Sequence, residues 1–181
     1  MESSRLEALK RYEILDTPAD GHFDRITLLA SKVFNMPIAI VSLVDEDRIW
    51  FRSSQGLGDV QQIEKTPGLC ASAILSDEIY LVEDARNDPR CLANPLVTGS
   101  FGLQFYAAAP LKTHDGHKLG TLCIIDKKKR YINTEQQALL AMMADLVMHE
   151  MELRLAARTK IRSFEQRIAE LEAQLNAPMR L

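Results

Sequence analysis

The sequence contains little that would place it among secreted, membrane-spanning or disulfide-stabilised proteins. Its three cysteines are an odd number at irregular spacing, which fits neither a disulfide framework nor a zinc motif and indicates reduced thiols. No stretch approaches the roughly 18 uninterrupted apolar residues of a membrane span, and the N-terminus lacks the basic start and apolar core of a signal peptide. We therefore expect a soluble, cytoplasmic protein without membrane contact.

Excess charge and catalytic motifs are missing as well. A net charge of −3 gives no electrostatic reason to expect a nucleic-acid partner, and the basic run Lys127 to Arg130 follows a strand end, where solvated loops are common. There is no Gly-x-Ser-x-Gly elbow, Walker loop or His-Glu-x-x-His helix. His114 and His117 flank one turn, but an exposed turn tip offers no closed ligand shell, so we expect no metal site.

Two helices are predicted near the N-terminus. Ser4 and Glu7 have the form of a capping box, and apolar residues recur at helical spacing, which predicts a helix over residues 4–15. A second apolar-periodic segment has Asp20 as a plausible N-cap and Asn35 near its end. Both helices need an apolar surface on which to pack, and the following segments supply a sheet.

Residues 38–44 and 49–53 are β-rich runs around a short acidic turn, which predicts an antiparallel hairpin. Residues 105–111 and 119–125 form a second pair, joined by Asp115-Gly116, a dipeptide typical of hairpin turns with two positive φ angles. The strands of this second pair are apolar on both faces, so each face must be covered. We expect helices on one face and a pocket on the other.

The region between the hairpins carries weaker signals. Residues 59–66 are polar and lack periodicity, which predicts a loop. Thr66 and Pro67 could serve as the N-cap and first residue of a short helix over 68–75. Residues 79–82 favour a short strand, and residues 92–97 favour one helical turn.

The longest predicted element follows the second hairpin. Thr134 and Gln137 form another capping-box pattern, and no Gly or Pro interrupts residues 135–177. The residues expected to pack on the sheet are Leu139, Met143, Leu146 and Leu153. The apolar residues that follow step by three and four, as the a and d positions of a coiled coil do: Ile161, Phe164, Ile168, Leu171 and Leu175. Leu153, Ala157 and Ile161 step by four, as at a coiled-coil stutter.

Ordered phrases across residues 5–153 resemble the GAF domain, a PAS-like small-molecule sensor module, in the branch found in bacterial signalling proteins. The phrases are Tyr12 to Pro18, Ile38 to Asp47, Trp50-Phe51, Leu69-Cys70-Ala71, Asp84 to Arg90, Asn94 to Val97 and the hairpin after Gln104. The resemblance implies an α+β fold, with an antiparallel β-sheet of five or six strands, helices on one face and a pocket on the other. A long C-terminal coiled-coil helix follows. The expected division is a sensor domain over residues 1–153 and a signalling helix over residues 154–181.

The resemblance also implies which side chains line the pocket. These are Trp50, Cys70, Ser72, Asp84, Phe101, Tyr106, Thr121 and Cys123, with Phe51 and Ala73 nearby. Strand alternation lets only one of Trp50 and Phe51 face inward, and we favour Trp50, whose indole could stack on a planar ligand. The alternative for every one of them is ordinary core packing. Asp84 could equally cap its own turn.

The expected function is small-molecule sensing by a homodimer that forms through the first and last helices and transmits ligand occupancy to a signalling output. The ligand is unknown, and the effector would be a separate protein of diguanylate cyclase or histidine kinase type. One alternative is a GAF-type free methionine-R-sulfoxide reductase that uses Cys70 and Cys91. Another is a ligand-free dimerisation module. The phrase around Cys70 lacks the histidine of bilin-binding GAF domains, and no Asn-Lys pair of the cyclic-nucleotide signature occurs.

Overall fold

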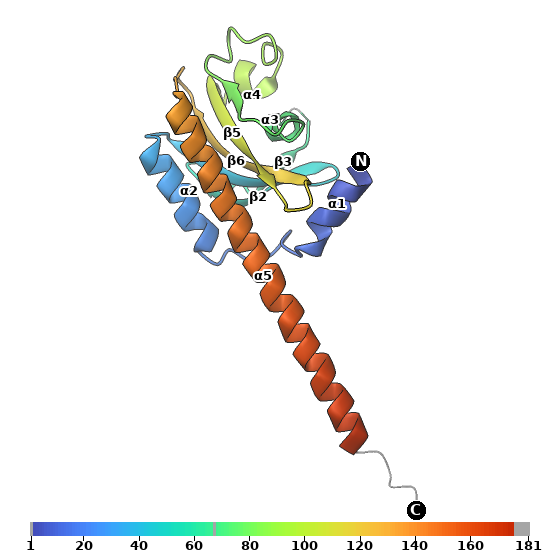
Figure 1. Ribbon diagram of the computed structural model, residues 1–181. Coiled ribbons are helices and arrows are strands. Elements are labelled where there is room, and N and C mark those ends of the chain that lie inside the picture. Colours follow the sequence, from blue (N-terminus) through green and yellow to red (C-terminus); the bar gives the residue numbers. More distant parts are fainter. Residues whose placement is uncertain (1, 67, 176–181) are drawn as a thin grey trace, which may run out of the picture.

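The computed structural model describes residues 2–66 and 68–175 (Figure 1). Its centre is a six-stranded sheet in the order β3-β2-β1-β6-β5-β4, with antiparallel neighbours throughout. The strands are β1 Ile38–Val44, β2 Arg48–Gln55, β3 Gln62–Glu64, β4 Tyr80–Val82, β5 Phe105–Lys112 and β6 Lys118–Asp126. The helices are α1 Glu2–Arg11, α2 His22–Val33, α3 Leu69–Ala73, α4 Pro95–Thr98 and α5 Thr134–Leu175. The α+β fold and both hairpins are confirmed.

The sheet separates two apolar clusters, because β5 and β6 are buried along nearly their whole length on both faces. On one face, α1, α2 and α5 pack against alternate residues such as Leu43, Ala107 and Leu122. On the other face, the short helices α3 and α4 and their connecting loops cover residues such as Ile40 and Tyr106. Figure 1 shows the long helices gathered on one side and α3 and α4 on the other. The helical layer and the opposite, loop-covered face are as expected.

The N-terminal helices begin elsewhere than predicted. α1 already runs from Glu2, so Ser4 lies inside the helix and the capping box of Ser4 and Glu7 is wrong. α2 begins at His22 after Gly21, and the carboxylate of Asp20 accepts a hydrogen bond from the His22 amide at 3.2 Å. Asp20 therefore caps the helix although it lies one residue before the N-cap position. Gly21 occupies that position with a left-handed φ of 78°.

The capping box of α5 lies one residue earlier than Thr134 and Gln137. Asn133 Oδ1 accepts a hydrogen bond from the Gln136 amide at 2.8 Å, and Gln136 Oε1 accepts one from the Asn133 amide at 3.0 Å. Two adjacent pairs in the sequence fit the motif, and Asn is at least as good an N-cap as Thr. The structure selects the pair that starts with Asn133.

The segments between the hairpins differ in detail from the prediction. α3 begins at Leu69 with Gly68 at the N-cap position, so Thr66 does not cap it, and Pro67 lies outside the described residues. α4 begins at Pro95, three residues after Leu92, and the side chain of its N-cap Asn94 accepts from the Leu96 amide. The predicted strand over 79–82 is present as β4. β3 was not predicted, because a strand of three residues with the single apolar residue Ile63 is too short to show a pattern in the sequence, and it forms by backbone pairing with β2.

The turn between β5 and β6 has only one residue with positive φ. Gly116 has φ 88°, and its amide donates to the Thr113 carbonyl at 3.0 Å, whereas Asp115 is outside the left-handed region. The expected turn with two positive φ angles is therefore wrong, because the loop is longer than two residues and needs only a glycine at its end. Asp115 instead pairs with Arg11 of α1 at 2.7 Å through both carboxylate oxygens.

The face that α5 turns toward the sheet was only partly foreseen. Met143 is buried as expected, but Leu139, Leu146 and Leu153 are exposed. The buried set is Leu140, Met143, Ala144, Val147, Met148 and Met151. The helix carries two apolar stripes on opposite sides, and sequence periodicity alone does not say which one meets the sheet. The stripe left in solvent consists of Leu139, Met142, Leu146, Leu153, Ala157, Ile161, Phe164, Ile168, Leu171 and Leu175, and we call it the outer stripe.

The position of the α5 cap yields a testable prediction. Asn133→Ala should lower the free energy of unfolding by about 1 kcal/mol, because the Gln136 amide at the helix start loses its side-chain acceptor. Thr134→Ala should change it by less than about 0.5 kcal/mol, as expected of a surface substitution away from a cap. Urea unfolding followed by circular dichroism measures both values. A larger loss for Thr134→Ala than for Asn133→Ala would contradict the observed cap.

Candidate ligand cavity

A cavity of about 210 Å³ lies between the sheet and the covering loops, on the face opposite the long helices. β1, β2, β5 and β6 form its floor, and β3, α3, α4 and two loops form its walls. The lining residues are Ile40, Phe51, Leu57, Val60, Ile63, Leu69, Cys70, Leu96, Phe101, Leu103, Tyr106 and Ile125. All are apolar except for the thiol of Cys70 and the hydroxyl of Tyr106. Such a cavity favours an apolar occupant.

The start of α3 lies close against the sheet beside this cavity. Gly68 has no side chain, and a Cβ at this position would lie 2.1 Å from Cδ1 of Ile49. The helix start can therefore approach β2 closely, which places Leu69 and Cys70 on the cavity wall. A larger residue at position 68 would move α3 away from the sheet.

The expectation that Trp50 faces the pocket is wrong. Trp50 lies opposite Leu43 in the β1–β2 ladder, and both belong to the cluster under the long helices. Directly paired residues point to the same face of a sheet, so Phe51, which pairs with Ser42, faces the cavity instead. The sequence established that only one of the two could face inward, but a register shift between Val41 and Ser42 decided which.

The structure brings three of the eight expected ligand residues to the cavity wall, namely Cys70, Phe101 and Tyr106. Thr121 and Cys123 are fully buried in β6 on the same face, below the lining residues. Ser72 is exposed and borders a different hollow. Asp84 closes its own turn, because its carboxylate accepts from the Arg86 amide and from the Asn87 side chain. Ser72 and Asp84 therefore lie away from the cavity.

Sequence reasoning missed much of the apolar wall. The missed residues are Ile40, Leu57, Val60, Ile63, Leu69, Leu96, Leu103 and Ile125. Leu57, Val60 and Ile63 recur every third residue within a segment that otherwise reads as a polar loop. That spacing is the only local signal that this segment has a buried side.

Below the cavity, two thiols meet three hydroxyls. The Tyr106 hydroxyl donates to Cys70 Sγ at 3.1 Å, and Ser42 Oγ lies 2.9 Å from Thr121 Oγ1. Hydrogen bonding between the Cys70 and Cys123 thiols lowers the pKa of Cys70, against the opposing effect of burial, and raises the pKa of Cys123 well above its ordinary value. Cys91 belongs to the same apolar cluster but is not a lining residue, and burial raises its pKa.

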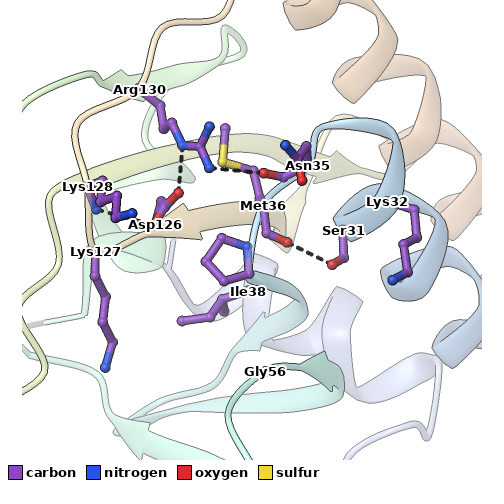
Figure 2. A pocket seen from close by; sticks show the side chains of 11 residues that line it. Ser31, Lys32, Asn35, Met36, Ile38, Gly56, Asp126, Lys127, Lys128 and Arg130 are labelled. Atoms are coloured by element: carbon purple, nitrogen blue, oxygen red, sulfur yellow. Dashed lines mark hydrogen bonds and ion pairs between the residues drawn. The ribbon is translucent and has the colours of Figure 1, made fainter.

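A larger, polar hollow of about 710 Å³ lies at the opposite end of the sheet from the hairpin turn, where α2 ends and β6 leaves the sheet (Figure 2). Its cationic side chains are those of Lys32, Lys127, Lys128 and Arg130. The Asp126 carboxylate accepts from Arg130 Nε at 2.6 Å, and Arg130 also donates to the Asn35 carbonyl. Arg130 and Asp126 thus tie the end of β6 to the end of α2, which gives this hollow a structural role.

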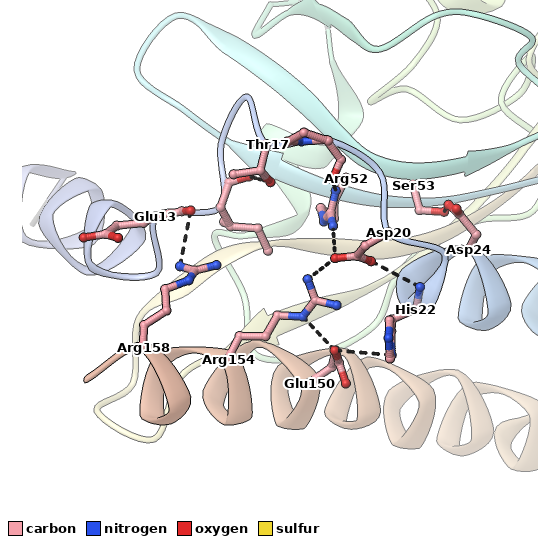
Figure 3. Close-up of polar contacts among 12 residues, drawn as sticks. Glu13, Thr17, Asp20, His22, Asp24, Arg52, Ser53, Glu150, Arg154 and Arg158 are labelled. Carbon is pink, nitrogen blue, oxygen red and sulfur yellow. Dashed lines mark hydrogen bonds and ion pairs between the residues drawn. The ribbon is translucent and has the colours of Figure 1, made fainter. Parts of the chain in front are cut away.

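A polar clamp connects the sheet to α5 where the helix leaves the domain (Figure 3). The Asp20 carboxylate accepts from Arg52 of β2 at 2.7 Å and also from Arg154 of α5. The guanidinium groups of Arg52 and Arg154 each lie 4.8 Å from the ring centre of Phe23. Further along α5, Arg158 donates to the Tyr12 carbonyl, and Arg162 pairs with Glu13 at 2.7 and 2.9 Å. The segment between α1 and α2 is thereby fixed to α5.

A single antiparallel sheet, with a layer of long helices on one face and a loop-covered apolar cavity on the other, places the protein among the PAS-like α+β domains. The sequence profile of the GAF domain matches residues 19–151. The chain belongs to the GAF domain family.

Individual relatives agree with this assignment. The chain is 41% identical over 148 residues to a cyclic di-GMP phosphodiesterase from Pseudomonas aeruginosa, a match that covers 81% of this chain and 25% of the relative. The chain therefore spans about a quarter of that protein's length.

Two solved structures show the same fold. The free methionine-R-sulfoxide reductase of Neisseria meningitidis has 17% identity and a TM-score of 0.63, with 86% of this chain and 92% of the other covered. The GAF domain of an Acinetobacter phosphoenolpyruvate-protein phosphotransferase has 16% identity and the same TM-score, with 86% and 97% covered. At these identities the likeness concerns the fold alone.

Within residues 2–66 and 68–175, no helix is long and apolar enough to cross a lipid bilayer. The same part of the chain contains no group of three or more His, Cys, Asp or Glu side chains that could hold a metal ion.

The clamp gives a pH-dependent prediction. The hydrogen bond from Arg154, which is the main cause, lowers the pKa of Asp20 to about 2 from an ordinary 3.8. Since the folded pKa is depressed, the stabilisation is present above about pH 4 and is lost as the pH falls toward 2. Asp20→Asn should therefore lower the free energy of unfolding at pH 6, by at most about 1 kcal/mol because water screens the pair.

Urea unfolding of wild type and Asp20→Asn at pH 6 and at pH 2.5 measures this difference. It should shrink at the lower pH, where Asp20 begins to bind a proton in the folded protein. An equal difference at both pH values would show that the carboxylate charge does not stabilise the clamp.

Proposed function

We propose that this chain is a regulatory GAF sensor that binds a small apolar molecule in the 210 Å³ cavity and transmits its presence through α5. The observation that carries the proposal is the cavity: an apolar space on the loop-covered face of the sheet, built from side chains of five strands, two short helices and the loops beside them. Apolar cavities in proteins bind apolar ligands such as benzene. No catalytic role is proposed.

The cavity dimensions limit the ligand class. A dry cavity of about 150 Å³ holds benzene, whereas drug-sized ligands occupy roughly 300 Å³ or more. We therefore propose a monocyclic or short-chain apolar molecule with at most one polar group. Phe51, Phe101 and Tyr106 would contact its apolar body, and the Cys70 thiol would lie near its polar group. Trp50, Ser72 and Asp84 have no place in this ligand set.

The outer stripe of α5 supports a homodimer. Successive members are three or four residues apart from Leu139 to Leu146 and from Ile161 to Leu175, and Leu153 follows Leu146 after seven residues, a full heptad. The two steps of four from Leu153 through Ala157 to Ile161 form the stutter. These side chains are exposed, for example 54% for Leu146 and 56% for Ile168. An apolar stripe of this length on a single helix is typical of a helix that packs on a second copy.

We propose a second helix for the interface other than the first helix, which the sequence suggested. Leu28, Leu29 and Val33 of α2 are exposed, and α2 lies beside α5 on the sheet (Figure 1). The exposed residues of α1 are polar instead. We therefore propose that the dimer forms through α5 and α2, with α5 continuing as a parallel coiled coil beyond about residue 153.

Phe51 and Arg52 connect the cavity to α5. They are neighbours on β2, and while Phe51 lines the cavity, Arg52 contacts Asp20 in the clamp that holds Arg154. Displacement of Phe51 by a ligand would move Arg52 on the other face of the strand. We propose that the clamp transfers this shift to α5 near the stutter, where two helix packings of similar energy are easiest to build. The proposed division remains residues 1–153 for sensing and 154–181 for output.

The relative from Pseudomonas aeruginosa supports an output connected with a cyclic dinucleotide, because its name is that of a cyclic di-GMP phosphodiesterase. A histidine kinase output is the other class proposed, since a domain of a two-component sensor histidine kinase protein shares the fold. The reductase alternative with Cys70 and Cys91 gains no support from the cavity, where only Cys70 is a lining residue. The cavity likewise disfavours a ligand-free dimerisation module.

Leu96→Phe should fill the cavity from the α4 side and prevent ligand binding. Benzene is a suitable probe. At ten times its Kd it should stabilise the wild type by about 1.4 kcal/mol, which raises Tm by roughly 3 to 6 °C. Leu96→Phe should show no such increase, because the added ring occupies the space. Leu75→Phe, the same substitution at an exposed residue outside the cavity, is the matched control and should respond as the wild type does.

Native mass spectrometry of the protein as purified complements this test, because a retained small molecule would identify the ligand. An equal benzene effect in wild type and Leu96→Phe would place binding elsewhere. The absence of any benzene effect in the wild type, with no retained molecule, would favour the ligand-free dimerisation module.

Charges in the outer stripe should dissociate the dimer. The double variant Leu146→Asp, Ile168→Asp should sediment at half the mass of the wild type, because each Asp would have to be buried without a partner. Gln166→Asp, which lies at an outward position of the coiled-coil repeat, should remain dimeric. Sedimentation equilibrium gives the masses, and circular dichroism checks the fold. A wild type that is monomeric at all concentrations would refute the dimer.

A further inference from the structure

We propose that Cys70 and Cys123 are a redox-active dithiol at the inner end of the cavity, which a small hydroperoxide such as hydrogen peroxide converts reversibly into a disulfide. This inference does not require an apolar ligand, and it uses a different cysteine pair from the reductase alternative. It assigns a modification site to the cavity, with one reactive thiol in its wall and the other beneath it.

The location of the two sulfur atoms is the first argument. Cys70 lines the cavity from α3, so its sulfur faces a space that a molecule the size of hydrogen peroxide can occupy. Cys123 lies on β6 in the same buried cluster as Cys70, and each thiol is the main influence on the pKa of the other. α3 packs against β6, so the two backbones are neighbours as well. The pair combines one thiol open to the cavity with one that is fully buried.

The hydrogen-bond donors around Cys70 are the second argument. Tyr106 donates its hydroxyl to Cys70 Sγ at 3.1 Å, and both residues are almost completely buried. Cys123, Ser42, Tyr106 and Thr121 all contribute hydrogen bonds that favour the Cys70 thiolate over the thiol. A thiolate, unlike a thiol, is nucleophilic. An ordinary structural cysteine would sit among apolar side chains without such donors.

The reaction balances with one peroxide per pair. The Cys70 thiolate attacks one peroxide oxygen, the O–O bond breaks, and the leaving hydroxide takes a proton to become water, which leaves Cys70 as a sulfenic acid. The Cys123 sulfur, after loss of its proton, attacks the Cys70 sulfur, and the hydroxyl of the sulfenic acid leaves as a second water. Two thiols are oxidised to one disulfide, and one peroxide is reduced to two waters. A dithiol reductant restores both thiols by exchange.

The bond would have a structural effect on the cavity. α3 has five residues and forms part of the cavity wall, and a covalent link to β6 would fix it to the sheet. The Tyr106 hydroxyl would also lose the negatively charged acceptor that the Cys70 thiolate provides. Oxidation is therefore a second input to the same sensor cavity.

Cys91 provides a matched control. It is fully buried in the same cluster, but it lies in the turn before α4, and burial raises its pKa. Burial alone would make all three cysteines equivalent. The proposal requires that Cys70 and Cys123 react with peroxide and that Cys91 does not.

Intact-mass spectrometry of the full chain before and after hydrogen peroxide tests the proposal, with peptide mapping to locate the bond. We expect the wild type and Cys91→Ser to lose two hydrogen atoms and to yield a peptide pair joined through Cys70 and Cys123. Cys123→Ser should instead gain one oxygen on Cys70, which dimedone traps as the sulfenic acid. Cys70→Ser should remain unmodified under the same conditions. Dithiothreitol should reverse the change in wild type.

Other outcomes would overturn the inference. One is a wild type whose three cysteines all remain open to alkylation after peroxide treatment and denaturation. Another is a disulfide that includes Cys91, which would revive the reductase pair. Circular dichroism of each variant guards against misfolding, and the wild-type result stands even if a variant does not fold. Because no apolar ligand is added, a failure here leaves the benzene experiment unaffected.

Discussion

The structure depends on the two central strands β5 and β6, which are apolar on both faces and must be shielded from water on both sides. One shield consists of long helices, which bury large apolar side chains in a dense layer. The other consists of two short helices and loops, which cover the sheet less densely. The cavity lies on the side with the less dense cover. The requirement to bury the strands thus produces both the stability of the domain and the space for a ligand.

The same sheet connects its two faces through neighbouring residues of one strand. Alternate residues of a strand point to opposite sides, so Phe51 at the cavity and Arg52 at the clamp are adjacent in the chain. Asp20 contacts an arginine of the sheet and an arginine of α5, and Phe23 lies against both guanidinium groups. A carboxylate shared between two cations depends on the position of both. This arrangement suits an element that responds to small displacements.

Cys70 and Cys123 give the cavity a chemical character that its apolar walls do not reveal. Most of the lining could hold only an apolar molecule, but at its inner end the Cys70 sulfur meets hydroxyl groups and a second thiol. The polar groups lie at one end of the space and the apolar groups at the other. A sensor with this division could respond to a ligand and to oxidation through the same short helix, α3.

The sequence by itself determined the fold family, both hairpins, the long final helix and the two-sided burial of the central strands, because each rests on local periodicity or on ordered phrases. Only the tertiary structure decided which of Trp50 and Phe51 meets the cavity, which stripe of α5 meets the sheet, and that residues 62–64 form a strand. These choices depend on strand register, helix rotation and backbone pairing, and a one-residue shift reverses the face to which a side chain points. The pairing of Cys70 with Cys123 belongs to the same group. The two residues are far apart in the chain, and only the packing of α3 on β6 places their sulfur atoms together.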